Sequence, residues 1–219
     1  MRLAAEGLFV KVSGVTTEED ALFAVALGAN AVSFDVSRSE RQVPVTTVGD
    51  IVKRLPQGVV AVGAFHHELP QRVIEVANAT GLAAVEVSGP IAVEDLVYVS
   101  ERVNHLLRAV PYDAERLSTA GGVDYLLVPD LDEPSALGSC LDLLAQSGPR
   151  TPVIAAGGLD PESVIAVVQH YPVFGVDVRA GVERSPGQID PVALGEFVAN
   201  ARWAYDHSEV ERHFDEWTL

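Results

Sequence analysis

Several side chains that could transfer protons stand where short apolar runs of the sequence end. Ser13, Asp35 and Asp130 each lie at or just beyond the end of such a run. Carboxyl and hydroxyl groups in these places can perform general acid–base chemistry if the fold brings the ends of the runs together. The sequence therefore offers these three residues as catalytic candidates.

Two glycine-containing loops in the second half of the chain indicate anion binding. One loop contains Gly157 and Gly158, and the other contains Asp177, Arg179 and Gly181. Glycine lets the backbone approach an anion closely, and N–H groups at a helix N-terminus attract it. Arg179 adds a positive charge. We expect these loops to bind phosphate, although glycines also serve tight turns that bind nothing.

The elements that must position these residues alternate between apolar runs and longer segments of helical spacing. The runs are continuously apolar, as expected for a parallel sheet with both faces buried. Strands are predicted at residues 8–12, 31–34, 59–65, 83–87, 106–110, 125–128, 152–156 and 174–178. Helices are predicted at 17–27, 47–55, 69–79, 93–103, 133–145, 161–170 and 191–205, with N-terminal caps at Thr17 and at Asp160, before Pro161.

Roughly eight such units predict an α/β fold of the (βα)8 TIM-barrel type, a parallel eight-stranded barrel with outer helices. An open doubly wound sheet is the alternative architecture. We expect one barrel domain over residues 1–205. Residues 206–219 are predicted to be an acidic tail that forms a short helix from Ser208 and packs on the barrel.

Composition narrows the classes of partner. The chain has 31 acidic and 15 basic residues, a formal net charge of −16. This charge argues against nucleic-acid binding, because phosphates would be repelled over most of the surface. Cys140 is the single cysteine, so one chain can form neither a disulfide nor a cysteine-based zinc site. We find no signal peptide and no apolar stretch that could span a membrane, and expect a cytoplasmic protein.

A set of short motifs runs through nearly the whole chain. They are KVSGVT at 11–16, EDA at 19–21, GANAV at 28–32, RQV at 41–43, VGAF at 62–65, AGGL at 156–159, GVDV at 175–178, GVE at 181–183 and SPG at 185–187. Together these motifs resemble those of the phosphoribosylanthranilate isomerase family of tryptophan biosynthesis. The resemblance implies a (βα)8 barrel that binds a phosphorylated small-molecule ligand, needs no cofactor or metal, and is a monomer or homodimer.

The reaction that this resemblance implies is an Amadori rearrangement. An acid opens the ring of an aminoaldose, a base removes the proton from C2, and a 1-amino-ketose forms. The family's base is a cysteine at the end of strand one, where this chain has Ser13. The family's acid is an aspartate at the end of strand six, where Val128 or Pro129 gives the direct match. Both catalytic positions are thus replaced, and Asp130 takes the acid's place only if the strand end is shifted.

Further candidate residues and two open alternatives accompany this interpretation. Asp35 offers a substitute carboxylate, and Arg41 matches the family arginine that faces the anthranilate carboxylate. Glu86 is either a catalytic carboxylate or a barrel-interior partner of Lys11 or Arg108. The chain is either an isomerase or a diverged phosphosugar-binding barrel that performs another reaction or only binds a ligand.

A pair of histidines, His66 and His67, follows the third predicted strand. Adjacent residues of an extended segment point in opposite directions, so both rarely bind one metal ion. We expect both histidines to lie in solvent, with an acid–base role for one of them as the alternative.

Overall fold

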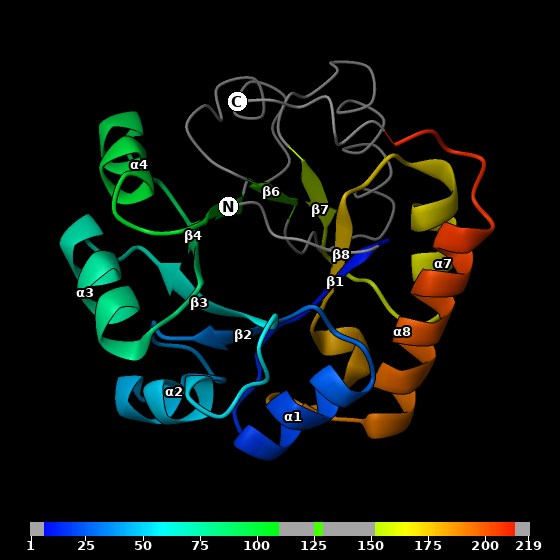
Figure 1. Ribbon diagram of the computed structural model, residues 1–219, viewed down its shortest axis with the longest axis horizontal. Helices are drawn as coiled ribbons and strands as arrows, with labels where there is room; N and C mark the ends of the chain where they lie inside the picture. Colours follow the sequence, from blue (N-terminus) through cyan, green and yellow to red (C-terminus); the bar gives the residue numbers. More distant parts are fainter. Residues whose placement is uncertain (1–6, 110–124, 129–151, 213–219) are drawn as a thin grey trace.

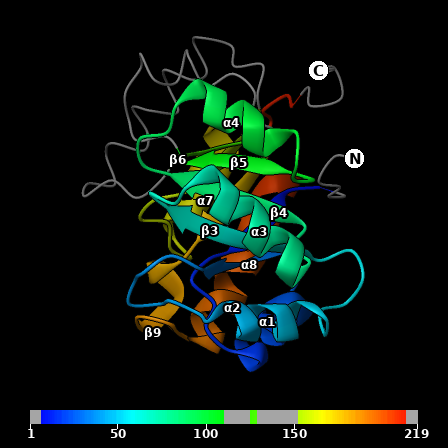
Figure 2. The same cartoon turned by 90° about the vertical axis from the view of Figure 1, so that its left-hand side faces the viewer.

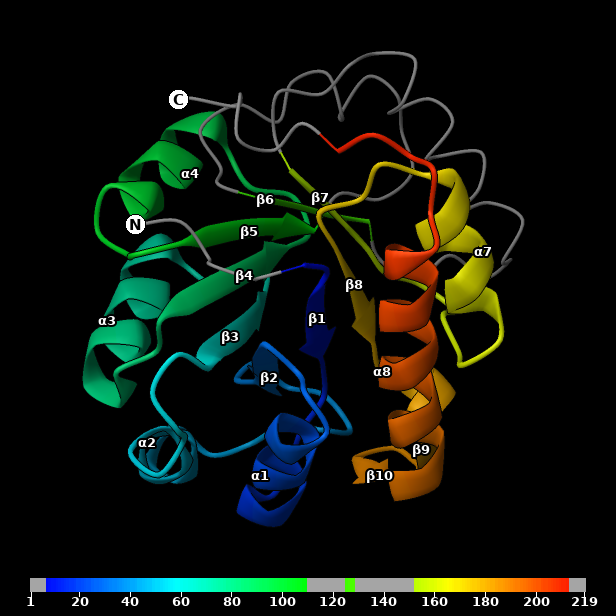
Figure 3. The same cartoon turned by 45° about the vertical axis from the view of Figure 1, so that its right-hand side comes forward.

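The chain forms a closed barrel of parallel strands. The computed structural model describes residues 7–109, 125–128 and 152–212, and for 125–128 it describes the backbone alone. The strands are β1 (Phe9–Val12), β2 (Ala31–Asp35), β3 (Val60–His66), β4 (Ala84–Ser88), β5 (Leu106–Ala109), β6 (Tyr125–Val128), β7 (Val153–Ala155) and β8 (Gly175–Val178). Each strand pairs with the next, and β8 pairs with β1, which closes the barrel and excludes the open sheet. Figure 3 shows β1 between β2 and β8.

Helices surround this barrel. They are α1 (Glu18–Ala26), α2 (Val45–Val52), α3 (Pro70–Thr80), α4 (Val93–Ser100), α7 (Ser163–His170) and α8 (Pro191–Asp206). Figure 1 shows them arranged around the strands, and Figure 2 shows α3 beside α4 on the β3–β5 side. The helix predicted at 133–145, Asp130 and Cys140 lie outside the described residues. The fold class and the strand and helix positions predicted within the described ranges are confirmed, with bounds shifted by up to three residues.

The side chains that point into the barrel change character along the strands. Because side chains alternate between the two faces of a strand, inward positions recur at every second residue. At the N-terminal end these positions are apolar: Phe9, Ala31, Val62, Leu107 and Ile154 form a buried cluster inside the barrel. The rings of Phe9 and Phe174 stack there at a centroid distance of 5.4 Å. This packed end leaves the C-terminal end of the barrel for the polar residues.

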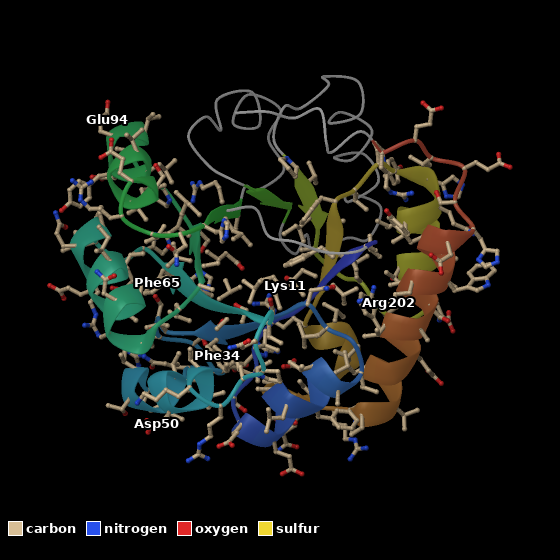
Figure 4. All side chains as sticks on the ribbon, in the orientation of Figure 1. Lys11, Phe34, Asp50, Phe65, Glu94 and Arg202 are labelled. Carbon is tan, nitrogen blue, oxygen red and sulfur yellow. The ribbon has the colours of Figure 1, made fainter. Side chains whose placement is uncertain are left out.

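The larger apolar core lies between the strands and the outer helices. It includes Phe34 and Phe65, both fully buried. Figure 4 shows both residues on the side of the strands that faces the helices, while Asp50 and Glu94 lie on outer helices. Burial of both strand faces explains why the strands are continuously apolar.

The two predicted helix caps have different outcomes. Thr17 accepts a hydrogen bond from the backbone N–H of Asp20 at 3.1 Å, which confirms the cap of α1. Asp160 Oδ1 accepts the N–H groups of Glu162 at 3.0 Å and Ser163 at 2.7 Å. However, α7 begins at Ser163, so the prediction that Pro161 is the first helical residue is wrong. Residues 161 and 162 form a turn over the Asp160 carboxylate instead.

Beyond the barrel strands the sequence interpretation missed one hairpin. A short 3-10 turn, η1 (Ala180–Val182), leads into β9 (Glu183–Ser185), which pairs with β10 (Gln188–Ile189). These strands are short and carry exposed polar residues, so no apolar run marks them. The hairpin fixes the chain between β8 and α8.

The chain after α8 is not helical over residues 208–212, so the helix predicted from Ser208 is wrong there. The Ser208 hydroxyl donates to the carbonyls of Val168 and Gln169 at 3.4 Å instead. Arg212 lies over the ring of Tyr205 at 4.7 Å. Residues 213–219 lie outside the described residues. No helix in the described part of the chain is both long and apolar enough to cross a membrane.

Candidate active site

A cavity of about 220 Å³ opens at the C-terminal end of the barrel. In a (βα)8 barrel this end carries the active site. Its polar lining comes from β2, β3, β4 and β8 and from the residues just after β1 and β8: Ser13, Ser33, Asp35, His66, Glu86, Ser88, Asp177 and Arg179. The loop after β7 supplies residues 156–159 and the loop after β8 supplies Ala180 and Gly181.

Three charged side chains from three strands meet at the base of this cavity, where Glu86 and Asp177 also line it. Lys11 Nζ lies 2.8 Å from Glu86 Oε2 and 3.2 Å from Asp177 Oδ1. The Lys11 side chain is 0% exposed, and Figure 4 shows it in the middle of the ring of strands. Register explains the meeting, because Lys11 is paired directly with Asp177 across β1 and β8. This confirms Glu86 as a barrel-interior partner of Lys11.

Ser13 connects this group of charges to the cavity. Its Oγ accepts a hydrogen bond from Lys11 Nζ at 2.6 Å and donates to Asp177 Oδ1 at 2.6 Å. We call Lys11, Ser13, Glu86 and Asp177 the floor cluster. It contains two carboxylates and one ammonium group, so it has an excess of negative charge when all three groups are ionised.

The pKa values of the floor cluster follow from burial and from this charge imbalance. Burial alone would lower the pKa of Lys11, but the charges of Asp177 and Glu86 outweigh it and raise that pKa above the ordinary lysine value. Burial raises the pKa of the Asp177 carboxyl, and the charge of Glu86 adds to the rise, while Lys11 and the Ser13 hydrogen bond oppose it. Lys11 is therefore a cation, and Asp177 holds a proton more readily than an exposed aspartate does.

Asp35 is a second predicted carboxylate that the structure places on the cavity wall. It is the last residue of β2, and only 4% of it is exposed. Its Oδ2 accepts a hydrogen bond from the Ser39 hydroxyl at 2.7 Å. The structure thus brings Ser13, Asp35 and Asp177 to one cavity, while Asp130 lies outside the described residues.

The two predicted glycine loops lie against each other beside the cavity. Gly157 and Gly158 have φ values of 92° and 62°, which side chains rarely adopt. A side chain at Gly181 would collide with the carbonyl oxygen of Leu159 in the other loop. Gly158, Arg179 and Gly181 all line the cavity. The glycines therefore allow close packing of the loops and also leave the backbone open to a ligand.

Arg41 lies next to the site but is held by another residue. Its Nε and Nη2 donate to the two carboxylate oxygens of Glu183 at 2.7 and 2.5 Å. This hydrogen bonding raises the pKa of the Arg41 guanidinium further. Glu183 Oε1 also accepts the N–H of Gly187 at 2.9 Å, and the Gly187 carbonyl accepts the Thr16 hydroxyl at 2.8 Å. We call Arg41, Glu183, Gly187 and Thr16 the rim clamp.

His66 is a cavity residue that the sequence interpretation placed in solvent. It is the last residue of β3, one residue beyond the predicted end of that strand. Counting every second residue from Val62 gives Ala64 and His66, so strand parity could have identified it. His67 is exposed, as expected. Within the described ranges no three His, Cys, Asp or Glu side chains are grouped to hold a metal ion.

Comparison with known proteins relates this barrel to one family. The family described as N-(5'-phosphoribosyl)anthranilate isomerase matches residues 10–200. An enzyme of that name from Pelobacter propionicus is 32% identical over 199 residues, covering 88% of this chain and 95% of the relative. The enzyme from Halobacterium salinarum is 34% identical over 206 residues, covering 88% and 94%.

A solved structure agrees with this relationship. It is a phosphoribosylanthranilate isomerase in complex with reduced 1-(o-carboxyphenylamino)-1-deoxyribulose 5-phosphate. It is 31% identical to this chain, superposes with a TM-score of 0.79, and the match covers 90% of this chain and 99% of that one. The chain described here therefore belongs to the N-(5'-phosphoribosyl)anthranilate isomerase family.

Proposed function

We propose that this protein isomerises N-(5'-phosphoribosyl)anthranilate to the corresponding 1-amino-ketose, a step of tryptophan biosynthesis. One observation carries the proposal: in a member of this family, a single cavity combines proton-transferring side chains with two glycine loops suited to phosphate. We place the enzyme in the cytoplasm, as a monomer or homodimer, with a barrel over 1–205 and a tail over 206–219. The reaction moves a proton from C2 to C1 and requires no cofactor.

The loops after β7 and β8 are the proposed phosphate site. The positive-φ glycines Gly157 and Gly158 leave their N–H groups uncovered by side chains, and an added Cβ at Gly158 would meet no atom within 4 Å. Gly181 brings the second loop to the same place, and Arg179 supplies charge. A phosphate held here fixes the sugar above the floor cluster.

Ser13 and Asp177 together are the proposed base. A serine hydroxyl is too weak a base to remove a C–H proton alone. The Ser13 hydroxyl already donates to Asp177, so it can pass its proton to that carboxylate while it accepts one from C2. Lys11 keeps Ser13 and Asp177 in position and stays charged throughout. The same pair can return the proton to C1.

The remaining predicted residues enter this proposal with different support. We retain Asp130 as an acid candidate on its place after β6, and Asp35 as a cavity carboxylate. Arg41 remains the candidate for the anthranilate carboxylate on the family resemblance alone. Because Glu183 holds Nε and Nη2, a ligand carboxylate must either displace Glu183 or use Nη1. We also propose that both family catalytic positions are replaced, by Ser13 at the cysteine position and by Val128 or Pro129 at the acid position.

Turnover of phosphoribosylanthranilate, followed by the loss of anthranilate-type fluorescence, tests this function. We expect turnover by the wild-type protein and a loss of about 10²-fold or more in Asp177→Asn, because removal of a general base typically costs 10²–10⁴-fold. Ser13→Cys restores the family residue and is expected to keep or raise the rate, whereas Ser13→Ala lowers it. Asp130→Asn tests the acid role predicted for Asp130.

The replacement of the cysteine by Ser13 favours one second candidate, a phosphosugar-binding barrel without this activity. Binding of the reduced ketose analogue that occupies the solved relative separates the two. Tight binding without turnover supports the second candidate, and turnover supports the first.

A further inference from the structure

A histidine that the proposed base does not include also lines the cavity. His66 ends β3, and the strand order β8-β1-β2-β3 places two strands between it and Asp177. Both residues line the same cavity. A ligand in this cavity thus has Ser13 and Asp177 on one side and an imidazole on another.

The imidazole of His66 has a fixed orientation. Its Nδ1 is hydrogen bonded to the hydroxyl of Ser88, its direct register partner on β4. The backbone N–H of His66 donates to the buried Ser37 hydroxyl at 2.9 Å. Ser37 in turn donates to Glu68 at 2.9 Å. With Nδ1 engaged by Ser88, Nε2 is the ring nitrogen left to meet a ligand.

The backbone immediately after His66 adopts an uncommon conformation. His67 has φ = 58°, in the left-handed region that non-glycine residues seldom occupy. Its ring lies so close to Gly89 that a Cβ there would be 2.6 Å from His67 Cε1. The turn separates the two histidines, so that His66 lines the cavity and His67 stays exposed. Non-glycine residues in this region often accompany functional sites.

Two carboxylates on neighbouring strands share the cavity with His66. The charged groups that share its cavity on neighbouring strands are Asp35 on β2 and Glu86 on β4, and Glu68 lies two residues along the chain. Asp35 and Glu86 are themselves engaged by Ser39 and Lys11.

We infer that His66, in place of the candidate Asp130, is a catalytic residue, the proton donor that opens the sugar ring. This inference rests on the proposed function. The imidazolium gives its Nε2 proton to the ring oxygen as the C1–O bond breaks, and the bonding pair stays on that oxygen. The nitrogen lone pair of the substrate forms a C1=N bond, which leaves an iminium group and a neutral imidazole.

The remaining steps restore His66. Asp177, through Ser13, takes the proton from C2, and the C–H electrons form the C1=C2 bond of an enolamine as nitrogen recovers its lone pair. The 2-hydroxyl then gives its proton to His66 while C2 becomes the carbonyl carbon. C1 receives the proton held by Ser13 and Asp177. All protons and electron pairs balance without an oxidant or reductant.

Substitutions of His66 and its exposed neighbour test the inference. His66→Asn keeps a donor near the position of Nδ1, and so preserves the contact with Ser88, but cannot transfer a proton. We expect kcat to fall about 10²-fold, the lower limit for a lost general acid, with KM and binding of the reduced ketose analogue within threefold of wild type. The matched control His67→Asn suits the left-handed backbone and is expected to keep kcat within twofold. Added imidazole is expected to restore turnover of His66→Ala.

The outcomes separate the two proposals. If the wild type turns over and His66→Asn keeps more than a third of its kcat, or if imidazole does not rescue His66→Ala, the inference about His66 is wrong and the function stands. If the wild type has no turnover, the proposed function fails and the ring-opening role fails with it. A large fall in kcat with rescue by imidazole supports both.

Discussion

The floor cluster and the rim clamp both lie at the C-terminal end of the barrel and both contain ion pairs. They differ in the number of carboxylates per cation and in the exposure of that cation. In the floor cluster one ammonium group serves two carboxylates, and its side chain has no contact with solvent. In the rim clamp one guanidinium meets one carboxylate with two hydrogen bonds, and the Arg41 side chain remains 16% exposed. The floor therefore has an excess of negative charge when its three groups are ionised, and the rim is balanced.

This difference separates reactivity from rigidity. When two buried carboxylates share one ammonium group, either carboxylate can bind a proton. Such an arrangement suits a group that must accept a proton and then return it. A guanidinium joined to a carboxylate by two hydrogen bonds fixes the geometry of both side chains and does not readily exchange protons. This contrast agrees with the proposed proton transfer at the floor, while at the rim Glu183 also holds the β9–β10 hairpin through Gly187.

Removal of the floor cation has the largest expected effect. Lys11→Met leaves Glu86 and Asp177 together without their counter-charge, and loss of one partner of a buried pair costs about 3–5 kcal/mol. Urea unfolding measures the loss. The control Lys53→Met removes a lysine that is 74% exposed beside Asp50, where about 0–1 kcal/mol is expected.

Neutralising the two carboxylates as well separates the effect of charge from the effect of packing. Lys11→Met combined with Glu86→Gln and Asp177→Asn removes all three charges, and should recover part of the lost stability. Equal losses for the single and the triple variant would mean that packing around Lys11 matters more than charge.

At the rim a smaller loss is expected. Glu183→Gln removes the negative charge but keeps one carbonyl oxygen for Arg41 or Gly187. A hydrogen bond to a charged group contributes about 1.5–3 kcal/mol, so we expect a loss in that range by urea unfolding. The control is Glu18→Gln, whose partner Arg54 is 63% exposed. A cost at Glu183 as small as that at Glu18 would remove the distinction between the rim clamp and an ordinary surface pair.

The sequence predicted the barrel strands that carry this site better than it predicted the contacts among the side chains of the site. Repeated βα units and continuously apolar strands were enough for the barrel, because period and burial are local properties of the chain. Strand ends then identified Ser13 and Asp35 as cavity residues. Asp177 was predicted to belong to a phosphate-binding loop, whereas the structure places it against Lys11 and Ser13. The arrangement of Lys11 between Glu86 and Asp177 depends on register across three strands, which no single segment encodes.

Residue type alone gave two incomplete interpretations. Arg41 resembles a ligand-binding arginine, but its partner Glu183 lies 142 residues away in a hairpin that no apolar run marks. His66 was assigned to solvent because the third strand was predicted to end at Phe65, one residue too early. An error of one residue matters at a strand end, because parity decides which face a side chain takes.

The two regions should also differ at alkaline pH. Lys11 has a raised pKa in the folded state, so its contribution to stability is complete below the unfolded-state value of about 10.4 and is lost as the pH rises toward the folded value. The stability difference between wild type and Lys11→Met should shrink by up to about 1.4 kcal/mol per pH unit above pH 10.4. The difference between wild type and Glu183→Gln should stay constant there, since the Arg41 pKa is also raised. Urea unfolding between pH 8 and pH 11 measures both, and parallel curves would contradict the assignment.

The smallest expected effect lies in the loop after β7, which is fixed by neither kind of ion pair. Asp160 holds this loop by accepting the N–H groups of Glu162 and Ser163 and the Ser163 hydroxyl. These bonds, chiefly that from the Ser163 backbone, lower the pKa of the Asp160 carboxyl. The contribution of this carboxyl to stability is therefore present above the unfolded-state pKa of about 3.9 and is lost as the pH falls through the folded-state pKa.

Asp160→Ala should cost about 1 kcal/mol of stability at neutral pH, as the loss of a side chain that accepts N–H groups at the start of a helix typically does, and less at pH 3. Thr17→Ala, which removes the hydroxyl cap of α1, should cost a similar amount at neutral pH. Because Asp160 precedes α7 and follows Leu159 of the proposed phosphate loop, its loss should also weaken binding of inorganic phosphate, and Thr17→Ala should not. Unchanged phosphate binding in Asp160→Ala would mean that the glycine loop keeps its shape without the Asp160 carboxylate.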